Sequence, residues 1–219
     1  MAVILADVFG SVNIGVYCFC NEKLAIVPPG LTNKKINELA NTLGVEVCKT
    51  TIGGSTLIGS LTVGNSNGIL VPHIIRDYEF DRINKFCKVN VVESNWTALG
   101  NVVLSNDSGA VIHPEAPEEL RNYVKDELRI RAVDATIGTL GFVGALGIAT
   151  NKGAILSPNA SAEEQAVIGE ALHVNVDVSA TNGGVSFVKS GILANSKGAV
   201  VGPLTRGAEL MQITTTLGV

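Results

Sequence analysis

A pattern that recurs five times along the chain constrains the fold more than any other feature. Each copy reads as a strand, a loop of small residues, a second strand, a tight turn, a third strand closed by proline, and a helix. The residues that end the turns lie 41 to 45 positions apart: Leu24, Gly68, Gly109, Gly153 and Gly198. The closing prolines keep a matching spacing: Pro28, Pro72, Pro114, Pro158 and Pro203. A period of this length indicates a repeat architecture built from one supersecondary unit.

An apolar residue followed by glycine marks the second strand of four copies: Ile14-Gly15, Ile58-Gly59, Leu99-Gly100 and Val143-Gly144. The fifth copy departs from this pattern and has Val188-Lys189 at the corresponding position. The second copy shows the expected unit in full: strand 45–50, loop 51–56, strand 57–63, turn 65–68 and strand 69–71. Helices are predicted near residues 32–43, 77–86, 117–128, 161–172 and 206–213.

The chain ends at the phase of the repeat at which it starts. First strands begin at Val45, Val89, Ile130 and Val174, and the next step reaches Val219, the last residue. The start, MAVILADVFGSVNIG, aligns with VEVCKTTIGGSTLIG of the second copy. An open array needs capped ends, whereas a closed ring needs none. We therefore predict a single domain over residues 1–219, with an N-terminal strand, residues 1–7, that closes the ring beside the fifth repeat.

Charge is scarce in the predicted strands and concentrated on the helices, so the strands are expected around the axis and the helices on the rim. The sequence thus predicts an α+β ring with five-fold pseudosymmetry. The small-residue loops gather at one end of this ring, called the loop end below. The Asn-x-x-Gly turns gather at the other, called the turn end. We expect the turn glycines to adopt the left-handed conformation that a tight hairpin uses.

Composition narrows the classes of partner. Hydrophobic residues make up 46% of the chain and aromatic residues only 5%, which indicates a core of Val, Ile, Leu and Ala. No apolar run approaches the roughly 18–20 residues that cross a bilayer, so we expect no membrane association and a cytoplasmic protein. The net charge of −4 disfavours general binding to nucleic acid through phosphates. Contact with RNA should therefore be local, and a basic protein partner fits the charge.

No residue pattern indicates catalysis, a cofactor or a metal. The four cysteines have no CxxC spacing and are expected to be reduced core residues: Cys18, Cys20, Cys48 and Cys87. The three histidines fall in different repeats, far in sequence from a nucleophile and an orienting acid. The segment IGGST at 52–56 lacks the Gly-Lys-Ser/Thr ending of a phosphate loop. We predict a protein that is not an enzyme and has no small-molecule substrate.

The predicted loop end is nearly uncharged and consists mainly of glycine and small polar residues, which suggests a flat surface for close approach. The only tryptophan of the chain, Trp96, falls in one of its loops. An exposed tryptophan is a favoured anchor of protein interfaces. The alternative is that Trp96 packs against its own neighbouring loop.

The five-fold ring resembles the pentein fold, the five-bladed αβ propeller. One group of penteins comprises enzymes that act on guanidino groups, with a channel cysteine near the C-terminus as the nucleophile. Here the last cysteine is Cys87, and repeats four and five contain none. This departure weighs against a guanidino-modifying hydrolase or amidinotransferase, which remains an alternative together with a ring scaffold for another protein.

The other group is the translation initiation factor 6 family of ribosome anti-association factors. The chain resembles it in MAV at the start, GNSNGILVP (64–72), ALGNVVLSNDSGAVIHP (98–114) and NKGAILSP (151–158), and is closer to the archaeal form. The resemblance implies a monomer that binds the large (50S) ribosomal subunit. It would contact ribosomal protein fourteen near the sarcin–ricin loop of the rRNA, and so block joining of the small (30S) subunit.

By this resemblance we expect the ribosome-binding residues at the loop end: Asn13, Gly15, Ser60, Asn95, Trp96, Asn101 and Lys189. Ser60 and Asn101 both follow the repeated glycine and so occupy matching positions. The turn end, with Lys23, Lys152 and Lys197, is the alternative and could meet RNA. The sequence leaves open the choice between the two ends, the mechanism of release, and whether the central channel is filled with solvent.

Overall fold

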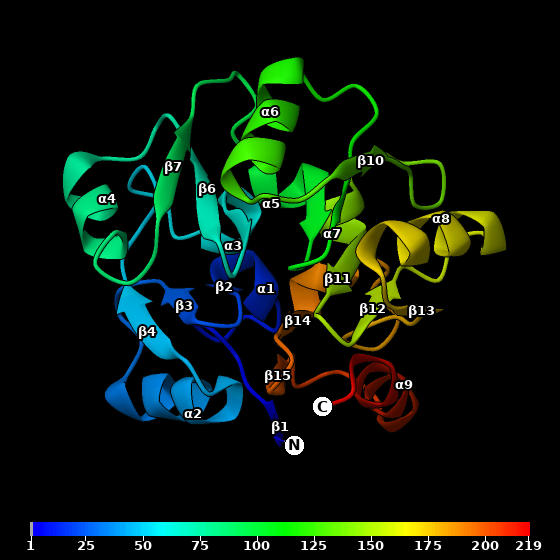
Figure 1. Cartoon of the computed structure of the whole chain (residues 1–219). Coiled ribbons are helices and arrows are strands. Elements are labelled where there is room, and N and C mark those ends of the chain that lie inside the picture. The colour runs from blue at the N-terminus through cyan, green and yellow to red at the C-terminus, as the bar shows by residue number, and fades with distance from the viewer. Residues whose placement is uncertain (1) are drawn as a thin grey trace.

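The computed structural model describes residues 2–219, and the five predicted repeats form a ring around a pseudo-five-fold axis (Figure 1). Residues 2–219 form five three-stranded sheets, in each of which the antiparallel hairpin of one repeat is extended by the first strand of the next repeat, which pairs in parallel. The five sheets are β2-β3-β4, β5-β6-β7, β8-β9-β10, β11-β12-β13 and β14-β15-β1. This arrangement confirms the predicted five-fold α+β ring.

The strands are short, and the middle strand of every sheet is buried. The antiparallel hairpins are β2 (Phe19–Cys20) with β3 (Leu24–Val27), β5 (Val63–Asn65) with β6 (Gly68–Pro72), β8 (Val103–Ser105) with β9 (Ala110–Ile112), β11 (Gly147–Ala149) with β12 (Gly153–Leu156), and β14 (Ile192–Ala194) with β15 (Gly198–Val201). The parallel outer strands are β4 (Glu46–Lys49), β7 (Val89–Val92), β10 (Ala132–Asp134), β13 (Asn175–Val178) and β1 (Ala2–Leu5).

Five long helices cover the rim, as predicted (Figure 1). They are α2 (Asn33–Leu43), α4 (Asp77–Ile83), α6 (Glu118–Glu127), α8 (Ala162–Leu172) and α9 (Gly207–Leu217). The sequence signals at the ends of α2 act as expected, because the Thr32 side chain accepts a hydrogen bond from the Lys35 N–H and Gly44 ends the helix in the left-handed conformation. Helix α4 is shorter and α9 longer than predicted.

The predicted second strands are wrong in their first half, which is a single helical turn in every repeat. These turns are α1 (Ile14–Tyr17), α3 (Ile58–Leu61), α5 (Leu99–Val102), α7 (Val143–Leu146) and the 3-10 turn η1 (Val188–Gly191). In the second repeat the strand therefore begins at Val63 instead of Leu57. Short apolar runs fit a buried strand and a buried helical turn equally well, and tertiary packing decides between them.

The five helical turns pack side by side in a closed circle around the axis, in the order α1, α3, α5, α7, η1. Glycine makes this possible. A Cβ on Gly59 would lie 2.0 Å from the carbonyl oxygen of Gly15, and a Cβ on Gly100 would lie 2.1 Å from that of Gly59. A Cβ on Gly144 would lie 2.4 Å from the Gly100 carbonyl oxygen. The repeated apolar-glycine pairs thus mark the contacts between neighbouring repeats.

Glycine has a different role at the turn end from the one expected. Gly68, Gly109 and Gly153 do not have positive φ angles, so the prediction of left-handed turn glycines is wrong. A Cβ on Gly109 would lie 1.9 Å from the carbonyl oxygen of Ala171, and one on Gly153 would lie 1.9 Å from that of Thr216. Gly109 and Gly153 are therefore required because their turns lie against the end of the next rim helix, whereas a Cβ on Gly68 would lie 3.1 Å from the Lys88 carbonyl oxygen.

Buried asparagines tie the turns to one another. The Asn65 side-chain amide donates to the carbonyl oxygens of Asn106 (3.3 Å) and Leu128 (2.9 Å), the latter at the end of the next rim helix. The Asn106 side-chain amide likewise donates to the carbonyl oxygens of Thr150 and Leu172. The Asn195 amide donates to those of Asn21 and Leu43. These hydrogen bonds join each repeat to the next in a low-dielectric site, where an unpaired amide would be costly.

The N-terminal strand pairs with the fifth repeat. Strand β1 runs parallel to β15, with Ala2 opposite Gly198 and Leu5 opposite Val201. The two chain ends lie near each other in Figure 1. Met1, which the sequence placed in the same strand, lies outside the described residues. Within residues 2–219, no helix has both the length and the apolar character that a membrane span needs.

The core is divided into apolar clusters that lie between repeats. One cluster joins Val63 and Leu70 of the second repeat to Ile112 and Leu120 of the third. Another joins Val200 of the fifth repeat to residues of the first, including Ile14 and Leu39 among others. Each repeat therefore buries its apolar face against a neighbour.

Replacing Gly100 with Ala tests the circle of helical turns. The added Cβ would meet the Gly59 backbone, so we expect the free energy of unfolding to fall by about 3 kcal/mol or more. Gly207→Ala is the matched control, because a Cβ at the start of α9 meets nothing within 4 Å. It should stay within about 1 kcal/mol of the wild type. Equal stability of both variants in urea unfolding would contradict the contact.

Candidate interaction surface

Five loops form the loop end of the ring. Four of them are tight turns closed by an isolated pair of bridging residues: Val8 with Ser11, Ile52 with Ser55, Ile137 with Leu140, and Thr181 with Val185. Their chain reversal uses left-handed residues, such as Gly53 (φ 61°) and Gly54 (φ 79°) in the second repeat. Each loop leads into one of the five helical turns around the axis.

A buried carboxylate fixes the loop of the second repeat. Glu79, in the first turn of α4, accepts hydrogen bonds from the backbone N–H groups of Gly53 (2.7 Å), Gly54 (2.8 Å) and Arg76 (2.9 Å), and from the Thr51 hydroxyl. Burial opposes ionisation, but these hydrogen bonds outweigh it and hold the pKa of Glu79 below its usual value. One side chain therefore caps the rim helix and clamps the loop.

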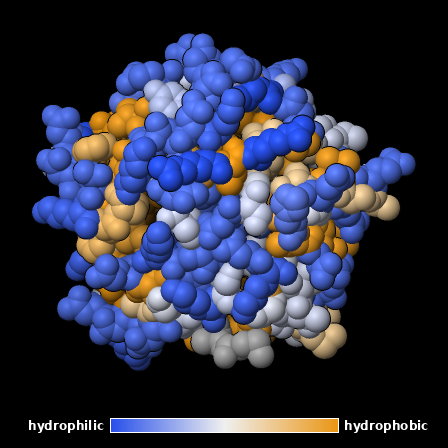
Figure 2. Space-filling view, viewed as in Figure 1, coloured by the Kyte–Doolittle hydropathy of each residue, from blue (hydrophilic) through white to orange (hydrophobic). Residues whose placement is uncertain are grey.

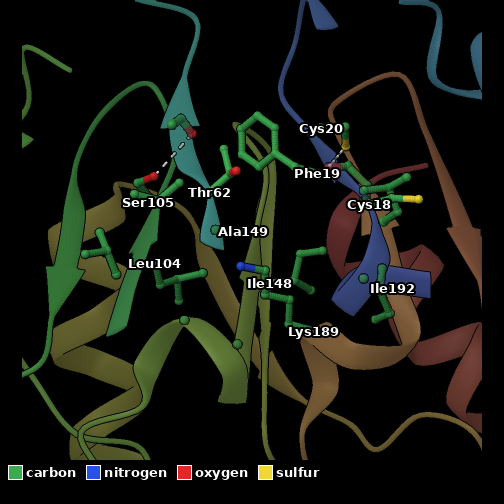
Figure 3. A pocket seen from close by; sticks show the side chains of 18 residues that line it. Cys18, Phe19, Cys20, Thr62, Leu104, Ser105, Ile148, Ala149, Lys189 and Ile192 are labelled. Atoms are coloured by element: carbon green, nitrogen blue, oxygen red, sulfur yellow. Dashed lines mark hydrogen bonds between the residues drawn. The ribbon is translucent and has the colours of Figure 1, made fainter. Parts of the chain in front are cut away.

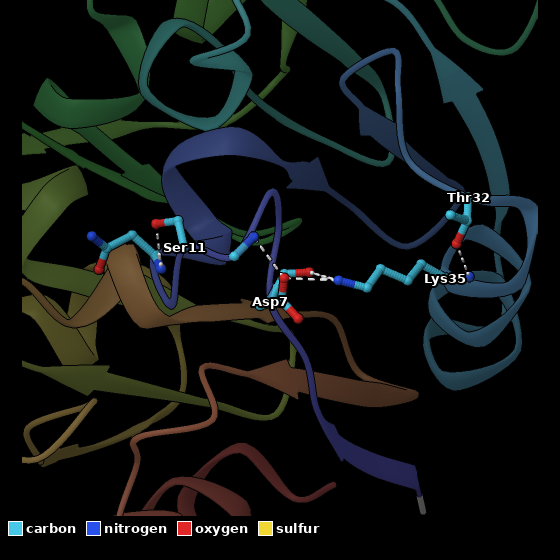
Figure 4. Close-up of polar contacts among 6 residues, drawn as sticks. Asp7, Ser11, Thr32 and Lys35 are labelled. Carbon is cyan, nitrogen blue, oxygen red and sulfur yellow. Dashed lines mark hydrogen bonds and ion pairs between the residues drawn. The ribbon is translucent and has the colours of Figure 1, made fainter.

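Equivalent clamps occur in three other repeats. Glu164 accepts from the N–H groups of Gly138 (2.9 Å) and Ser161 (2.9 Å), and Glu209 from those of Gly183 (3.1 Å) and Arg206 (2.7 Å). In the first repeat the partners are exchanged, since Asp7 lies in the loop and Lys35 on the helix (Figure 4). The Lys35 ammonium donates to Asp7 at 2.8 Å.

The third repeat has the buried Leu120 where the other repeats have a charged clamp. Its loop is closed instead by Ser94, whose hydroxyl accepts from the Trp96 N–H at 3.1 Å. The Trp96 ring makes an edge contact with His113, with 5.1 Å between centroids, and His113 makes one with Phe142 at 5.8 Å. The tryptophan is half-buried, so it packs against its neighbours and still has an open face.

Large apolar side chains are exposed on this end, which corrects the expectation of a flat surface of small residues. Phe142 and Phe187 are each 48% exposed, and Phe9 is 52% exposed. Further exposed residues of the same loops and their neighbours are Leu57, Leu140, Val185 and Leu204. Small residues do occur nearer the axis, at the third position of each helical turn, where they are half-exposed: Val16, Ser60, Asn101, Ala145 and Ser190.

The turn end differs from the loop end because its polar side chains form hydrogen bonds to other parts of the ring. The Lys197 ammonium donates to the carbonyl oxygens of Glu22 (2.9 Å) and Gly44 (3.0 Å). Lys152 donates to that of Gly218 at 3.1 Å, and Lys23 to that of Ser66 at 2.8 Å. These three lysines stabilise rim-helix ends and hairpin turns. The face shown in Figure 2 is largely hydrophilic, with hydrophobic residues in separate patches.

The four thiols are poorly suited to nucleophilic chemistry. Burial raises the pKa of Cys18 to about 12 and those of Cys48 and Cys87 to about 11. Burial also raises the pKa of Cys20. A nucleophilic cysteine needs the opposite shift, toward thiolate at neutral pH. In the part of the chain that the structure describes, no group of three or more His, Cys, Asp or Glu side chains could hold a metal.

Comparison with known proteins agrees with this architecture over its whole length. A model of the eIF-6 family matches residues 3–216. The chain belongs to the eIF-6 family. Translation initiation factor 6 of Staphylothermus marinus is 37% identical over 218 residues, covering 97% of this chain and 96% of that protein.

Two further archaeal relatives are similar over almost their whole length. Translation initiation factor 6 of Methanocaldococcus jannaschii is 36% identical over 227 residues, covering 100% of this chain and 99% of that protein. The protein of the same name from Sulfolobus acidocaldarius is 37% identical over 211 residues, covering 94% and 95%. The family gives the chain a role in translation initiation, and the relatives support an archaeal origin.

The residues predicted to bind the ribosome gather around the loop end of this eIF-6 ring. Asn13 lies next to α1, Asn95 is exposed beside Trp96, and Ser60 and Asn101 take matching places on α3 and α5. The exposed Phe142 and Phe187, which directly precede α7 and η1, were not among the predicted residues. Both phenylalanines stand at the same position of their repeats, and this shared position is the feature of the sequence that could have indicated them.

Gly15 and Lys189, the two remaining predicted residues, act inside the ring. A Cβ on Gly15 would lie 1.8 Å from the Lys189 carbonyl oxygen, so Gly15 is a packing contact. The Lys189 side chain points into the axial channel (Figure 3), and its ammonium donates to the Gly100 carbonyl oxygen at 2.6 Å. Loss of hydration lowers the pKa of Lys189 to about 8.

The hydrogen bonds of Glu79 predict that Glu79→Gln is less stable than the wild type, and that the difference depends on pH. The amide cannot accept all the hydrogen bonds of the carboxylate, so the free energy of unfolding should fall by about 1–3 kcal/mol at pH 7. Because the pKa of Glu79 is lowered, this difference should shrink as the pH falls below 4.5. Asp81→Asn, on the exposed face of α4, is the control and should change stability by less than about 0.5 kcal/mol. A loss independent of pH would contradict the assignment.

Lys189 predicts a second pH effect of the same sign, at alkaline pH. The folded state disfavours the charged form of Lys189, so the wild type should become more stable relative to Lys189→Met as the pH rises from about 8 to 10.5. We expect a relative gain of about 1–3 kcal/mol in the free energy of unfolding over this range. A constant difference between the two proteins in urea titrations without halide would contradict the loss of hydration at Lys189.

Proposed function

We propose that this chain binds the large ribosomal subunit through its loop end and keeps the small subunit from joining by covering the intersubunit face. Family membership supports the ribosomal context. The observation that carries the choice of surface is the exposed apolar set at the loop end, above all Phe142 and Phe187. Several large apolar side chains exposed at one end of a protein are candidates for an interaction site.

The loop end is also rigid, which favours tight binding. The clamps of Glu79, Glu164 and Glu209 hold three loops in place before any partner arrives. A surface that is already ordered loses less conformational entropy on association. Aromatic side chains on such a base can fill pockets of a partner as anchors of the interface.

Charge supports a protein component in the contact. The chain carries a net charge of −4, and the described loops of the loop end contribute little of it. Ribosomal proteins are mostly basic, so an acidic ring is attracted to them and repelled by bare RNA. We propose ribosomal protein fourteen of the large subunit, near the sarcin–ricin loop, as the partner.

The proposed contact residues combine the sequence prediction with the exposed aromatics: Asn13, Ser60, Asn95, Trp96, Asn101, Phe142 and Phe187. Gly15 and Lys189 support this surface from inside the ring. The action is steric and requires no catalysis, which agrees with the raised pKa of the Cys18 thiol. We further propose that residues 1–219 act as one domain and as a cytoplasmic monomer.

Co-sedimentation with purified large subunits tests the proposal. Phe142→Ser combined with Phe187→Ser should weaken binding at least about 10-fold, because two apolar anchors are lost. Met211→Ser is the matched control, since Met211 is 68% exposed on the rim helix α9. Both proteins should unfold at the wild-type temperature, because all three side chains are exposed. Equal binding of both variants, or no binding by the wild type, would contradict the proposal.

A further inference from the structure

The axis of the ring contains a channel that the proposed function does not use. A cavity of about 70 Å³ lies between the inner strands, next to the circle of helical turns. Most of its wall is apolar, with Leu104, Ile148 and Ile192 among the lining residues (Figure 3). Polar side chains also point into it, from Thr62, Ser105 and Lys189.

Lys189 brings an uncompensated positive charge into this channel. No ion pair of Lys189 occurs in the described part of the chain, where the salt bridges use Lys35, Lys88 and Arg121. Among residues 2–219, only the Gly100 carbonyl oxygen accepts from its ammonium, which has three donors. Lys189 is only partly accessible to solvent, and a charge that loses water without gaining a counter-charge is costly.

Thr62 supplies a second unsatisfied group in the same wall. The residue is 0% exposed, and its hydroxyl has no hydrogen-bond partner among the described residues. The nearby Ser105 hydroxyl already donates to the Gly64 carbonyl oxygen at 3.3 Å. Buried hydroxyl groups nearly always have a partner, so an orphan facing a cavity points to a bound species.

We propose that the channel binds one small monovalent anion, of the size of chloride, held by the Lys189 ammonium and the Thr62 hydroxyl. Both groups can donate hydrogen bonds, and an anion accepts them while it offsets the buried charge. The bound anion would also stabilise the charged ammonium of Lys189. It would therefore oppose the loss of hydration, which lowers the pKa of this group. The site is specific to the fifth repeat, because the other four have glycine in place of Lys189.

The surroundings limit the anion to a small, singly charged one. The cavity of about 70 Å³ has room for an ion of the size of chloride. Glu22 and Asp107 line the mouth of the channel at the turn end. Their carboxylates accept from the backbone N–H groups of Ser196 (2.9 Å) and Ser66 (2.7 Å), and their charge disfavours phosphate or another multivalent anion.

Thermal unfolding in sodium bromide and in sodium gluconate at equal ionic strength tests for the site. A ligand that binds only the folded state raises the unfolding temperature with concentration. The wild type should unfold at a higher temperature in bromide, by several degrees, and Thr62→Val should show a smaller difference. Lys189→Met keeps the length of the side chain but removes its charge. For this variant we expect no difference in unfolding temperature between bromide and gluconate beyond the general effect of the salt. The same bromide difference in the wild type and Lys189→Met would overturn the site.

Crystals soaked in bromide give a direct readout that does not depend on the folding of a variant. The anomalous scattering of bromide should give a peak within contact distance of the Lys189 Nζ and the Thr62 Oγ1. A channel that shows no anomalous peak, and therefore holds only water, would overturn the proposal.

Discussion

The contact between a glycine and two backbone carbonyl groups at the axis is the constraint on which the ring depends. Gly59, for instance, leaves room for the carbonyl oxygens of both Gly15 and Cys18, at 2.0 and 2.4 Å from where a Cβ would stand. Because a glycine makes this contact in four of the five helical turns, it sets the distance between neighbouring repeats around the circle. The rim helices, the sheets and the loops are positioned by this inner circle.

The two ends of the ring divide the structural and the binding roles. At the turn end, buried asparagine side chains and the lysine side chains donate hydrogen bonds to neighbouring turns and helix ends. This end therefore holds the repeats together. At the loop end, carboxylates such as Glu79 work from behind the loops and leave the front uncharged. Phe142 and Phe187 are exposed on this fixed support. An interface can therefore vary at the loop end without disturbing the closure of the ring.

The ring and its rim helices were predictable because the anchors recur at a fixed period, and Thr32 and Gly44 mark the ends of α2 in the sequence itself. The helical turns were missed because an apolar run such as residues 57–63 carries no periodicity that separates a turn from a strand. The turn glycines were misread because spacing does not distinguish a left-handed residue from a close contact. Ser60 and Asn101 were found through their repeat position. Phe142 and Phe187 also share a repeat position, but the sequence does not tell whether an aromatic side chain there is exposed or buried.

Hydrogen–deuterium exchange of the protein bound to isolated large subunits tests the central claim most directly. Amide exchange reports which backbone segments a partner covers. The account predicts slower exchange on binding in the loops at residues 8–13, 51–57, 94–98, 136–142 and 181–187, with unchanged exchange in the turns at residues 21–24, 65–68 and 195–198. Protection confined to the turns would place the contact at the opposite end and contradict the account.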